Sequence, residues 1–176
     1  MELKELARLI YEKAYITGEF LLRSGQISHE YFDKYQFEAE PQLLSEIASA
    51  INNRIEERFD GLAALEMGGI PIATAISMIN KLPMVFVRKK AKEYGTRRIA
   101  EGMDINGKNL LVVEDVVTSG GQIILSVEEL RKVGANIKTA VCVIDREQGG
   151  KENLSKVGIE LISLFTMSEI KKFAKV

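Results

Sequence analysis

The stretch VVEDVVTSGGQ, residues 112–122, decides the fold. Its first valines favour a buried strand, and they run directly into two adjacent carboxylates, Glu114 and Asp115. The Thr-Ser-Gly-Gly turn that follows opens a helical pattern near Gln122. Glycine lets the backbone approach a ligand closely, and the unpaired N–H groups at the start of a helix carry partial positive charge. The stretch therefore predicts a strand, a loop that binds a phosphate group, and a helix.

Other interpretations fit this stretch less well. It lacks the Gly-Lys-Ser/Thr ending of a Walker A loop and the glycine spacing of a dinucleotide fingerprint. An ordinary strand–turn–helix connection capped by Thr118 and Ser119 would leave an acidic pair in a buried strand, which costs free energy. Because two carboxylates beside a phosphate would repel it, we expect them to accept hydrogen bonds from sugar hydroxyls or to lie near a divalent cation.

Short apolar runs alternate with helical lengths on both sides of this stretch. The runs are residues 62–65, 84–87, 109–113, 137–144 and 159–164. Helical patterns occupy residues 70–79 and 122–133, and Gly134 follows the second where a C-terminal cap is expected. Strands that are apolar on both faces are typical of a parallel sheet covered by helices, which binds ligands at the carboxyl ends of its strands. The predicted fold class is α/β, with a mostly parallel central sheet flanked by helices.

The two ends of the chain show different patterns. Residues 3–14 form one apolar helical face, residues 18–38 alternate around Ser24-Gly25 like a hairpin or two short strands, and a second helical stripe begins at Pro41. We expect residues 1–40 to form a small hood-like N-terminal segment. At the other end, Thr166 and Glu169 form a possible capping box before a short helix.

The composition limits the class of protein. The 176 residues include 24 Lys and Arg against 25 Asp and Glu, so no global positive field attracts nucleic acid or anionic lipid. No apolar run reaches about 18 residues, and the charged N-terminus is unlike a signal peptide. Cys142 is the only cysteine, which excludes an internal disulfide and a cysteine-rich metal site. We expect one soluble, cytoplasmic domain, residues 1–176, that binds neither nucleic acid nor a membrane.

Residues 88–108, RKKAKEYGTRRIAEGMDINGK, do not follow the packing pattern. Five Lys or Arg residues precede Arg98, and no apolar period is sustained. A loop of this length without secondary structure is usually functional or disordered in a compact domain. We predict a mobile loop whose bases contact an anionic ligand, although composition alone also permits a solvated run of charge.

Five motifs follow one another along the chain in a familiar order. They are GEFLLRSGQIS near the N-terminus, GGIPIAT at 68–74, RKKAKEYG at 88–95, EDVVTSGGQ at 114–122 and DREQGG at 145–150. Residues 114–122 resemble the ribosyl-diphosphate signature of the type I phosphoribosyltransferases. The N-terminal Ser-Gly hairpin together with DREQGG resembles the orotate phosphoribosyltransferases in particular, and the resemblance covers nearly the whole chain.

The resemblance implies an activity. In that family, the 5-phosphoribosyl group of 5-phospho-α-D-ribose 1-diphosphate is transferred to orotate, which gives orotidine 5′-phosphate and diphosphate in de novo pyrimidine (UMP) biosynthesis. It implies Mg²⁺ as cofactor, bound through the diphosphate and the ribose hydroxyls and not held mainly by protein side chains. It also implies a homodimer in which the loop of one subunit reaches the site of its neighbour.

The resemblance also implies site residues. Lys89, Lys92 and Asp115 would be catalytic. The residues expected to contact the ribosyl donor are Arg88, Lys89, Lys92, Tyr94, Glu114, Asp115, Val116, Val117, Thr118, Ser119, Gly120, Gly121 and Gln122. Those expected to contact orotate are Thr118, Arg146, Arg23 and Phe32, where the planar guanidinium of Arg146 suits a planar carboxylate and Tyr31 is an alternative stacking surface to Phe32.

The chain departs from the family pattern at several positions, and some residues keep alternative interpretations. Tyr94 stands where the family's loop commonly has histidine. Residues 67–69, Met-Gly-Gly, replace a frequent lysine, so we carry over no diphosphate contact there. Arg146 could instead form an ion pair with Asp145 or Glu147, and the aromatic residues of the hairpin could be core residues. The only histidine, His29, is expected to be an ordinary surface residue.

Two other functions remain open from the sequence. One is a phosphoribosyltransferase for a purine or another pyrimidine base. The other is a regulator that senses the donor without catalysis. Such a regulator would usually carry a DNA-binding module or a basic face, and the sequence shows neither.

Overall fold

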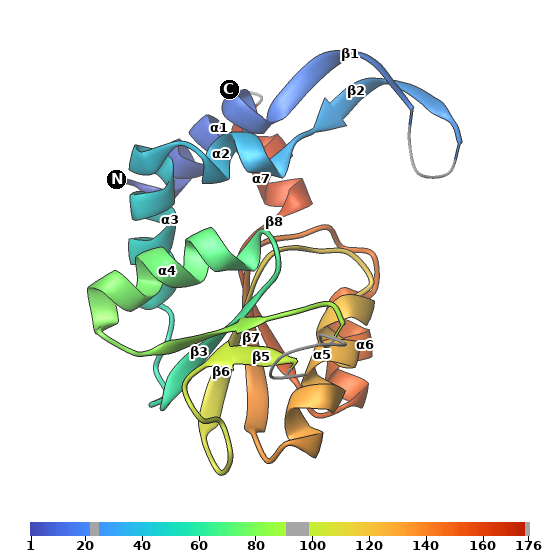
Figure 1. The fold of residues 1–176 in the computed structure, drawn as a ribbon. Coiled ribbons are helices and arrows are strands. Elements are labelled where there is room, and N and C mark those ends of the chain that lie inside the picture. Colours follow the sequence, from blue (N-terminus) through green and yellow to red (C-terminus); the bar gives the residue numbers. More distant parts are fainter. Residues whose placement is uncertain (22–24, 91–98, 175–176) are drawn as a thin grey trace.

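A six-stranded sheet forms the centre of the molecule (Figure 1). The structure is a computed structural model and describes residues 1–21, 25–90 and 99–174. The strand order is β5-β4-β3-β6-β7-β8, and every neighbouring pair is parallel except β4 and β5. The strands are β3 (Gly61–Leu65), β4 (Met84–Val87), β5 (Ala100–Gly102), β6 (Asn109–Val117), β7 (Asn136–Asp145) and β8 (Glu160–Thr166).

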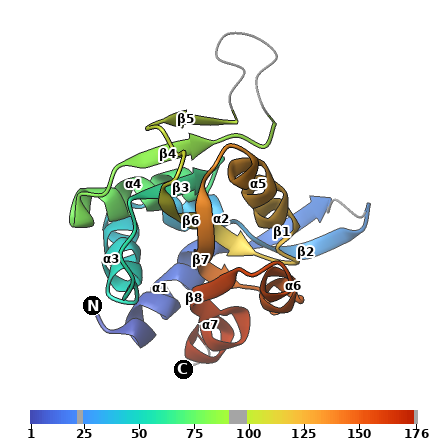
Figure 2. The same cartoon turned by 90° about the horizontal axis from the view of Figure 1, so that it is seen from below.

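Helices cover both faces of this sheet, as Figure 2 shows from below. The helices α3 (Pro41–Asn52) and α4 (Gly69–Asn80) lie on one face, and α5 (Gly121–Lys132) and α6 (Gly150–Lys156) lie on the other. Successive residues of a strand point to opposite faces. Leu111 and Val113 of β6 therefore pack into the first core, and Leu110 and Val112 pack into the second. The prediction of a helix-covered sheet with strands apolar on both faces is confirmed.

The N-terminal segment forms a separate layer above the sheet (Figure 1). Helix α1 (Leu3–Ala14) leads into the antiparallel pair β1 (Tyr15–Leu21) and β2 (Ile27–Phe32), and then into the short helix α2 (Lys34–Glu38). The C-terminal helix α7 (Met167–Ala174) lies beside α1 (Figures 1 and 2). We call residues 1–40 the hood segment.

The expectation that residues 18–38 form strands throughout is wrong at their C-terminal end. Residues 34–38 are helical, and Asp33 caps this helix by accepting a hydrogen bond from the Tyr35 backbone N–H at 3.1 Å. Five residues are too few for the apolar period of a helix to be visible, so only the capping aspartate signals it.

Two helix ends agree with their sequence signals. Thr166 N donates to Glu169 Oε2 at 2.8 Å, and Glu169 N donates to Thr166 Oγ1 at 3.2 Å, which is the expected capping box. After α5, Gly134 has a φ of 95°. Gly134 N donates to Arg131 O and Ala135 N donates to Leu130 O, as in a Schellman motif.

The expectation that residues 88–108 lack secondary structure is wrong for their second half. Residues 100–102 form β5, an edge strand paired with β4, and Ile105 is buried in the core. Helix α6 was not predicted either, because its seven residues contain a single buried apolar side chain, Leu154. The expected loop residues Lys92 and Tyr94 lie outside the described residues.

Cys142, the only cysteine of the sequence, is fully buried in β7 as part of the core. In the described parts of the chain, no helix has both the length and the apolar character needed to span a bilayer.

Candidate active site

The predicted phosphate loop lies between the carboxyl end of β6 and the start of α5. Gly120 has a φ of 76° and precedes the first residue of the helix, so its left-handed conformation turns the chain from strand to helix. Thr118 and Ser119 are exposed. The side chain of Asn153, from α6, donates to Ser119 O at 3.0 Å. The loop is therefore fixed from behind, while its two hydroxyl groups and the N-terminal N–H groups of α5 remain open to a ligand.

A second loop, residues 146–149, follows β7 and packs against the first. Arg146 N donates to Val117 O at 2.8 Å. A Cβ atom on Gly150 would lie 2.6 Å from Thr118 O, so only glycine permits this contact. The motifs EDVVTSGGQ and DREQGG, far apart in the sequence, thus form one continuous surface.

Arg146 is not paired with its acidic neighbours. Asp145 Oδ1 accepts a hydrogen bond from Glu147 N at 2.9 Å, and Glu147 Oε2 accepts one from Ser168 N at 2.8 Å. Among the described residues no ion pair joins Arg146 to either acid, and its Nε atom is buried without a hydrogen-bond partner. A buried guanidinium N–H without a partner is costly, which makes Arg146 a candidate for contact with a ligand. The alternative that Arg146 only forms a local ion pair is not what the structure contains.

A pocket of about 640 Å³ lies between this loop and the hood segment. Three of the four residues expected to contact the base line it, namely Phe32, Thr118 and Arg146. The fourth, Arg23, lies outside the described residues. The other lining residues are Tyr11, Tyr15, Ser28, Glu30, Tyr31, Gln148, Met167 and Lys171.

Several of these lining residues were not predicted. Tyr11 comes from α1, and Met167 and Lys171 come from α7, at opposite ends of the chain. No local pattern signals that they meet, whereas Gln148 could have been found because it lies inside DREQGG. Tyr15 forms a short hydrogen bond with Glu30 across the hairpin, and this bond raises the pKa of Tyr15 to about 12.

The sequence left open whether the aromatic residues of the hairpin line the site or belong to the core, and the structure contains both cases. Phe37 is fully buried in the core, and its ring centroid lies 6.4 Å from that of Phe32. Tyr31 and Tyr35 are exposed, and Tyr31 also lines the pocket. Phe32 therefore has the core on one side and the pocket on the other.

The acidic pair is buried and nearly closed to solvent. Asp115 is fully buried, and its Oδ2 forms an ion pair of 2.6 Å with Nζ of Lys34 from α2. Sequence reasoning expected a sugar or a cation beside these acids and missed Lys34. Burial opposes ionisation of Asp115, but hydrogen bonds with Glu114 and Lys34 and the charge of Lys34 lower its pKa overall.

A third carboxyl group, Glu38, also lies near Asp115. It is 5% exposed, and its Oε1 has no hydrogen-bond partner among the described residues. Burial, and then the negative charge of Asp115, raise the pKa of Glu38 to about 9. The same two causes raise the pKa of Glu114, so Asp115 is the one acid of the three whose pKa is lowered from its ordinary value.

The basic segment, residues 88–108, begins beside the start of α4. Lys89 N donates to Glu66 Oε1 at 2.7 Å, and Arg88 N donates to Ile99 O at 2.8 Å. The Lys89 side chain is exposed, and Nε of Arg88 is buried without a hydrogen-bond partner in the described chain. Since β4, β3 and β6 are parallel, the first basic residues, which follow β4, lie at the same edge of the sheet as the phosphate loop. The peptide bond between Glu66 and Met67 is cis.

The other residues expected to contact the ribosyl donor differ in how far they are exposed. Val117 is buried and Val116 is half-buried in β6, and their backbone groups already have partners, since Val117 O accepts from Arg146 N and Val116 N donates to Asp115 Oδ1. Gln122 uses its side-chain amide to donate to Ser126 Oγ at 3.2 Å within α5. Gly121 is exposed at the start of that helix.

The described residues offer no protein-held metal centre, because no three His, Cys, Asp or Glu side chains among them are arranged to hold an ion. Beside Asp115, the position of a cation is taken by the Lys34 ammonium. A divalent ion bound mainly by the oxygens of a ligand, outside this cluster, is compatible with these residues.

Comparison with known proteins identifies the family. Residues 34–171 match the family model of the phosphoribosyl transferase domain. An orotate phosphoribosyltransferase of Nocardioides sp. is 46% identical over 155 residues, covering 88% of this chain and 87% of that protein. One from Pyrococcus horikoshii is 40% identical over 174 residues, covering 97% of this chain and 94% of that protein.

Solved structures agree with these relatives. The crystal structure of orotate phosphoribosyltransferase from Aeropyrum pernix superposes with a TM-score of 0.81 at 29% identity, covering 95% of this chain and 96% of that one. The chain therefore belongs to the phosphoribosyl transferase domain family, among the orotate phosphoribosyltransferases.

Proposed function

We propose that this chain transfers the 5-phosphoribosyl group of 5-phospho-α-D-ribose 1-diphosphate to orotate, giving orotidine 5′-phosphate and diphosphate in de novo pyrimidine (UMP) biosynthesis. The observation that carries the assignment of the base is Arg146. Its buried Nε has no hydrogen-bond partner in the described chain, and it lines the pocket together with Phe32 and Thr118. A planar guanidinium matches the carboxylate of orotate, and an aromatic ring matches its flat face.

The donor would lie across the adjacent loop. The backbone N–H groups from Thr118 to Gln122 and the hydroxyls of Thr118 and Ser119 would bind the 5′-phosphate, because a helix start favours an anion. Glu114 and Asp115 would accept hydrogen bonds from the ribose hydroxyls. This role requires the ribose to approach carboxylates that the protein otherwise encloses.

The leaving diphosphate would be stabilised by the basic segment. As the bond from C1 to the diphosphate breaks, positive charge develops on the sugar and negative charge on the leaving group. Lys89 and Lys92 would neutralise the latter, with Arg88 and the Tyr94 hydroxyl as further hydrogen-bond donors. Mg²⁺, bound through the diphosphate and ribose hydroxyls, would supply additional positive charge there.

A competing proposal is the same transfer to another base. The test is an absorbance assay of base consumption with the ribosyl donor and Mg²⁺, run in parallel with orotate, uracil, hypoxanthine and adenine. We expect turnover with orotate alone, since the other bases lack the carboxylate that Arg146 would bind. Turnover of uracil at the same rate as orotate would reject the assignment of the base, and no turnover of any base would reject the transferase function.

We also propose that the active site is shared between two subunits of a homodimer, with residues 88–108 of one chain reaching the other. A mixture of a Lys89→Ala, Lys92→Ala chain with an Asp115→Asn chain should then regain partial activity, because half of the hybrid sites have all their side chains. Verified heterodimers without any recovery would show that the segment acts within its own subunit.

A further inference from the structure

The ion pair between the hood segment and the acidic pair of β6 has no role in the function proposed above. We propose that Lys34 is a positioning residue for the ribosyl donor, acting through Asp115. This inference rests on the proposed function, since it assumes that Asp115 meets the ribose. It adds Lys34 of α2 to a site in which the other residues proposed to contact the ribosyl donor lie at the edge of the sheet.

Lys34 is the cation that keeps Asp115 charged in a buried place. Asp115 has no exposed surface, and Glu38 and Glu114 are two further carboxyl groups beside it. An isolated buried carboxylate would take up a proton, and neighbouring acids add to that tendency. Nζ of Lys34 lies 2.6 Å from Asp115 Oδ2 and supplies the opposing charge. An ionised carboxylate accepts stronger hydrogen bonds from a diol than a neutral carboxyl group does.

Lys34 also fixes the direction in which the carboxylate points. Asp115 Oδ1 accepts from Val116 N at 2.5 Å, and Gly68 packs so closely that a Cβ atom there would lie 1.5 Å from Asp115 Oδ2. The backbone thus restrains Asp115 from two sides, and Lys34 restrains it from the third. Lys34 comes from outside the sheet and its loops, as does Glu38 beside Asp115, so the position of the hood segment controls the geometry of the acid.

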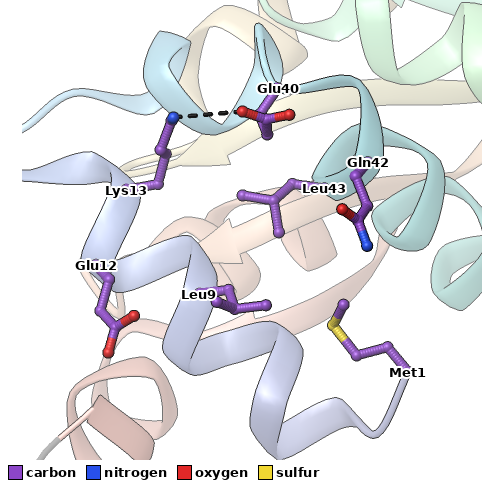
Figure 3. Close-up of a pocket in the computed structure, with 7 residues that line it drawn as sticks. All are labelled: Met1, Leu9, Glu12, Lys13, Glu40, Gln42 and Leu43. Atoms are coloured by element: carbon purple, nitrogen blue, oxygen red, sulfur yellow. Dashed lines mark hydrogen bonds and ion pairs between the residues drawn. The ribbon is translucent and has the colours of Figure 1, made fainter.

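The chain offers a matched control in the same segment. Lys13 of α1 forms an ion pair with Glu40 at 3.3 Å, as Figure 3 shows, on an exposed surface beside Leu9 and Leu43. Lys13→Met therefore removes a lysine and an ion pair from the hood without touching β6. Lys34→Met removes the charge of Lys34 and keeps most of its length, whereas Lys34→Arg keeps the charge.

The experiment is calorimetric binding of 5-phospho-α-D-ribose 1-diphosphate with Mg²⁺ and without any base. We expect Lys34→Met to weaken binding on the order of 10- to 100-fold, because it leaves a buried acid without its partner. Lys34→Arg should restore most of the affinity, and Lys13→Met should bind as the wild type does. In an Asp115→Asn background, the Lys34→Met change should alter the affinity less than about twofold, since its target is already neutral.

Each outcome decides one of the two proposals. If the wild-type protein does not bind the donor, the proposed function fails. If it binds, but Lys34→Met binds equally well or more tightly, Lys34 is not a positioning residue, and tighter binding would mean that it competes with the ribose. Equal losses in the wild-type and Asp115→Asn backgrounds would show that Lys34 does not act through Asp115. If Lys34→Met alone does not fold, weaker donor binding by the double variant than by Asp115→Asn alone would still overturn the proposal, because the double variant has no unpaired buried charge.

Discussion

The carboxyl ends of β6 and β7 lie side by side, yet the charged residues at the two ends differ in their partners. Near the end of β6, the acid Asp115 is completely enclosed and forms an ion pair with Lys34. At and after the end of β7, the acids Asp145 and Glu147 accept hydrogen bonds from backbone donors, and Nε of Arg146 has no hydrogen-bond partner in the described chain. The first arrangement stabilises a charge within the fold, and the second leaves a guanidinium N–H without a partner in the described chain. The difference shows that the hydrogen bonds of the neighbours, and not charge alone, decide whether a charged group is already paired within the fold.

The largest effect should come from removing the unpartnered charge. Arg146→Ala should lower kcat/KM for orotate on the order of 100-fold, because a charge-assisted, two-pronged contact to a carboxylate is lost. Donor affinity, measured by calorimetry without a base, should stay close to that of the wild type. Arg146→Lys is the matched variant and should recover only part of the activity, since an ammonium lacks the planar fork. Equal losses of orotate use and donor binding would contradict the separation of the two loops.

The second-largest effect should come from a substitution at Gly150 that pushes the loop after β6 away from the loop of residues 146–149. In Gly150→Ala, the new Cβ would lie 2.6 Å from Thr118 O and from Val117 Cγ1. Because one of these atoms is backbone, we expect a loss of about 1–3 kcal/mol in the free energy of unfolding, measured with urea, together with weaker donor binding. Gly121→Ala is the control for stability, because its Cβ would meet only Ser119 Oγ, at 3.7 Å. Unchanged stability of Gly150→Ala would show that the loops can separate freely.

A third test concerns the enclosed acids. Glu38 is an acid whose pKa is raised from 4.5 to about 9 in the folded protein. Its favourable contribution is therefore complete below pH 4.5 and is lost as the pH rises towards about 9. Glu38→Gln keeps the shape and cannot ionise, so it should be more stable than the wild type by about 1–3 kcal/mol at pH 9, and by much less at pH 5.

Urea unfolding of both proteins at these two pH values measures that difference. Glu19→Gln, at an exposed position of the same hood segment, is the matched control. A gain from Glu38→Gln that is the same at both pH values would show that Glu38 does not change its protonation on folding.

The smallest effect should come from changing Glu147, which anchors the loop of residues 146–149 by accepting a hydrogen bond from Ser168 N. Hydrogen bonds with Ser168 lower the pKa of Glu147, so this anchor is strongest above the ordinary pKa of the group and weakens as the pH falls through the lowered value. Glu147→Gln keeps an acceptor oxygen but loses the charge. We expect KM for orotate to rise roughly two- to fivefold at pH 8, because Arg146 is held less accurately, with kcat nearly unchanged. A change confined to kcat would contradict a positioning role for this anchor.

Local patterns in the sequence predicted much of this molecule. The β6–loop–α5 unit, the strands apolar on both faces, the cap at Gly134 and the Thr166–Glu169 capping box all depend on residues a few positions apart. The short elements α2, β5 and α6 were missed, because five, three and seven residues give too little periodicity. The resemblance to a known family predicted Phe32, Thr118 and Arg146 as contacts of the base, and all three line one pocket in the structure.

The sequence by itself determined the fold class, the strand–loop–helix unit from β6 to α5 and the family, because each of these depends on a continuous stretch of residues or on an ordered set of motifs. Only the tertiary structure decided which charges are satisfied. It brought Lys34 of the hood to Asp115 of β6, and it assigned Glu147 to Ser168 and not to Arg146. The physical reason is that the free energy of a buried charge depends on which groups surround it in space, and those groups come from elements distant in the chain.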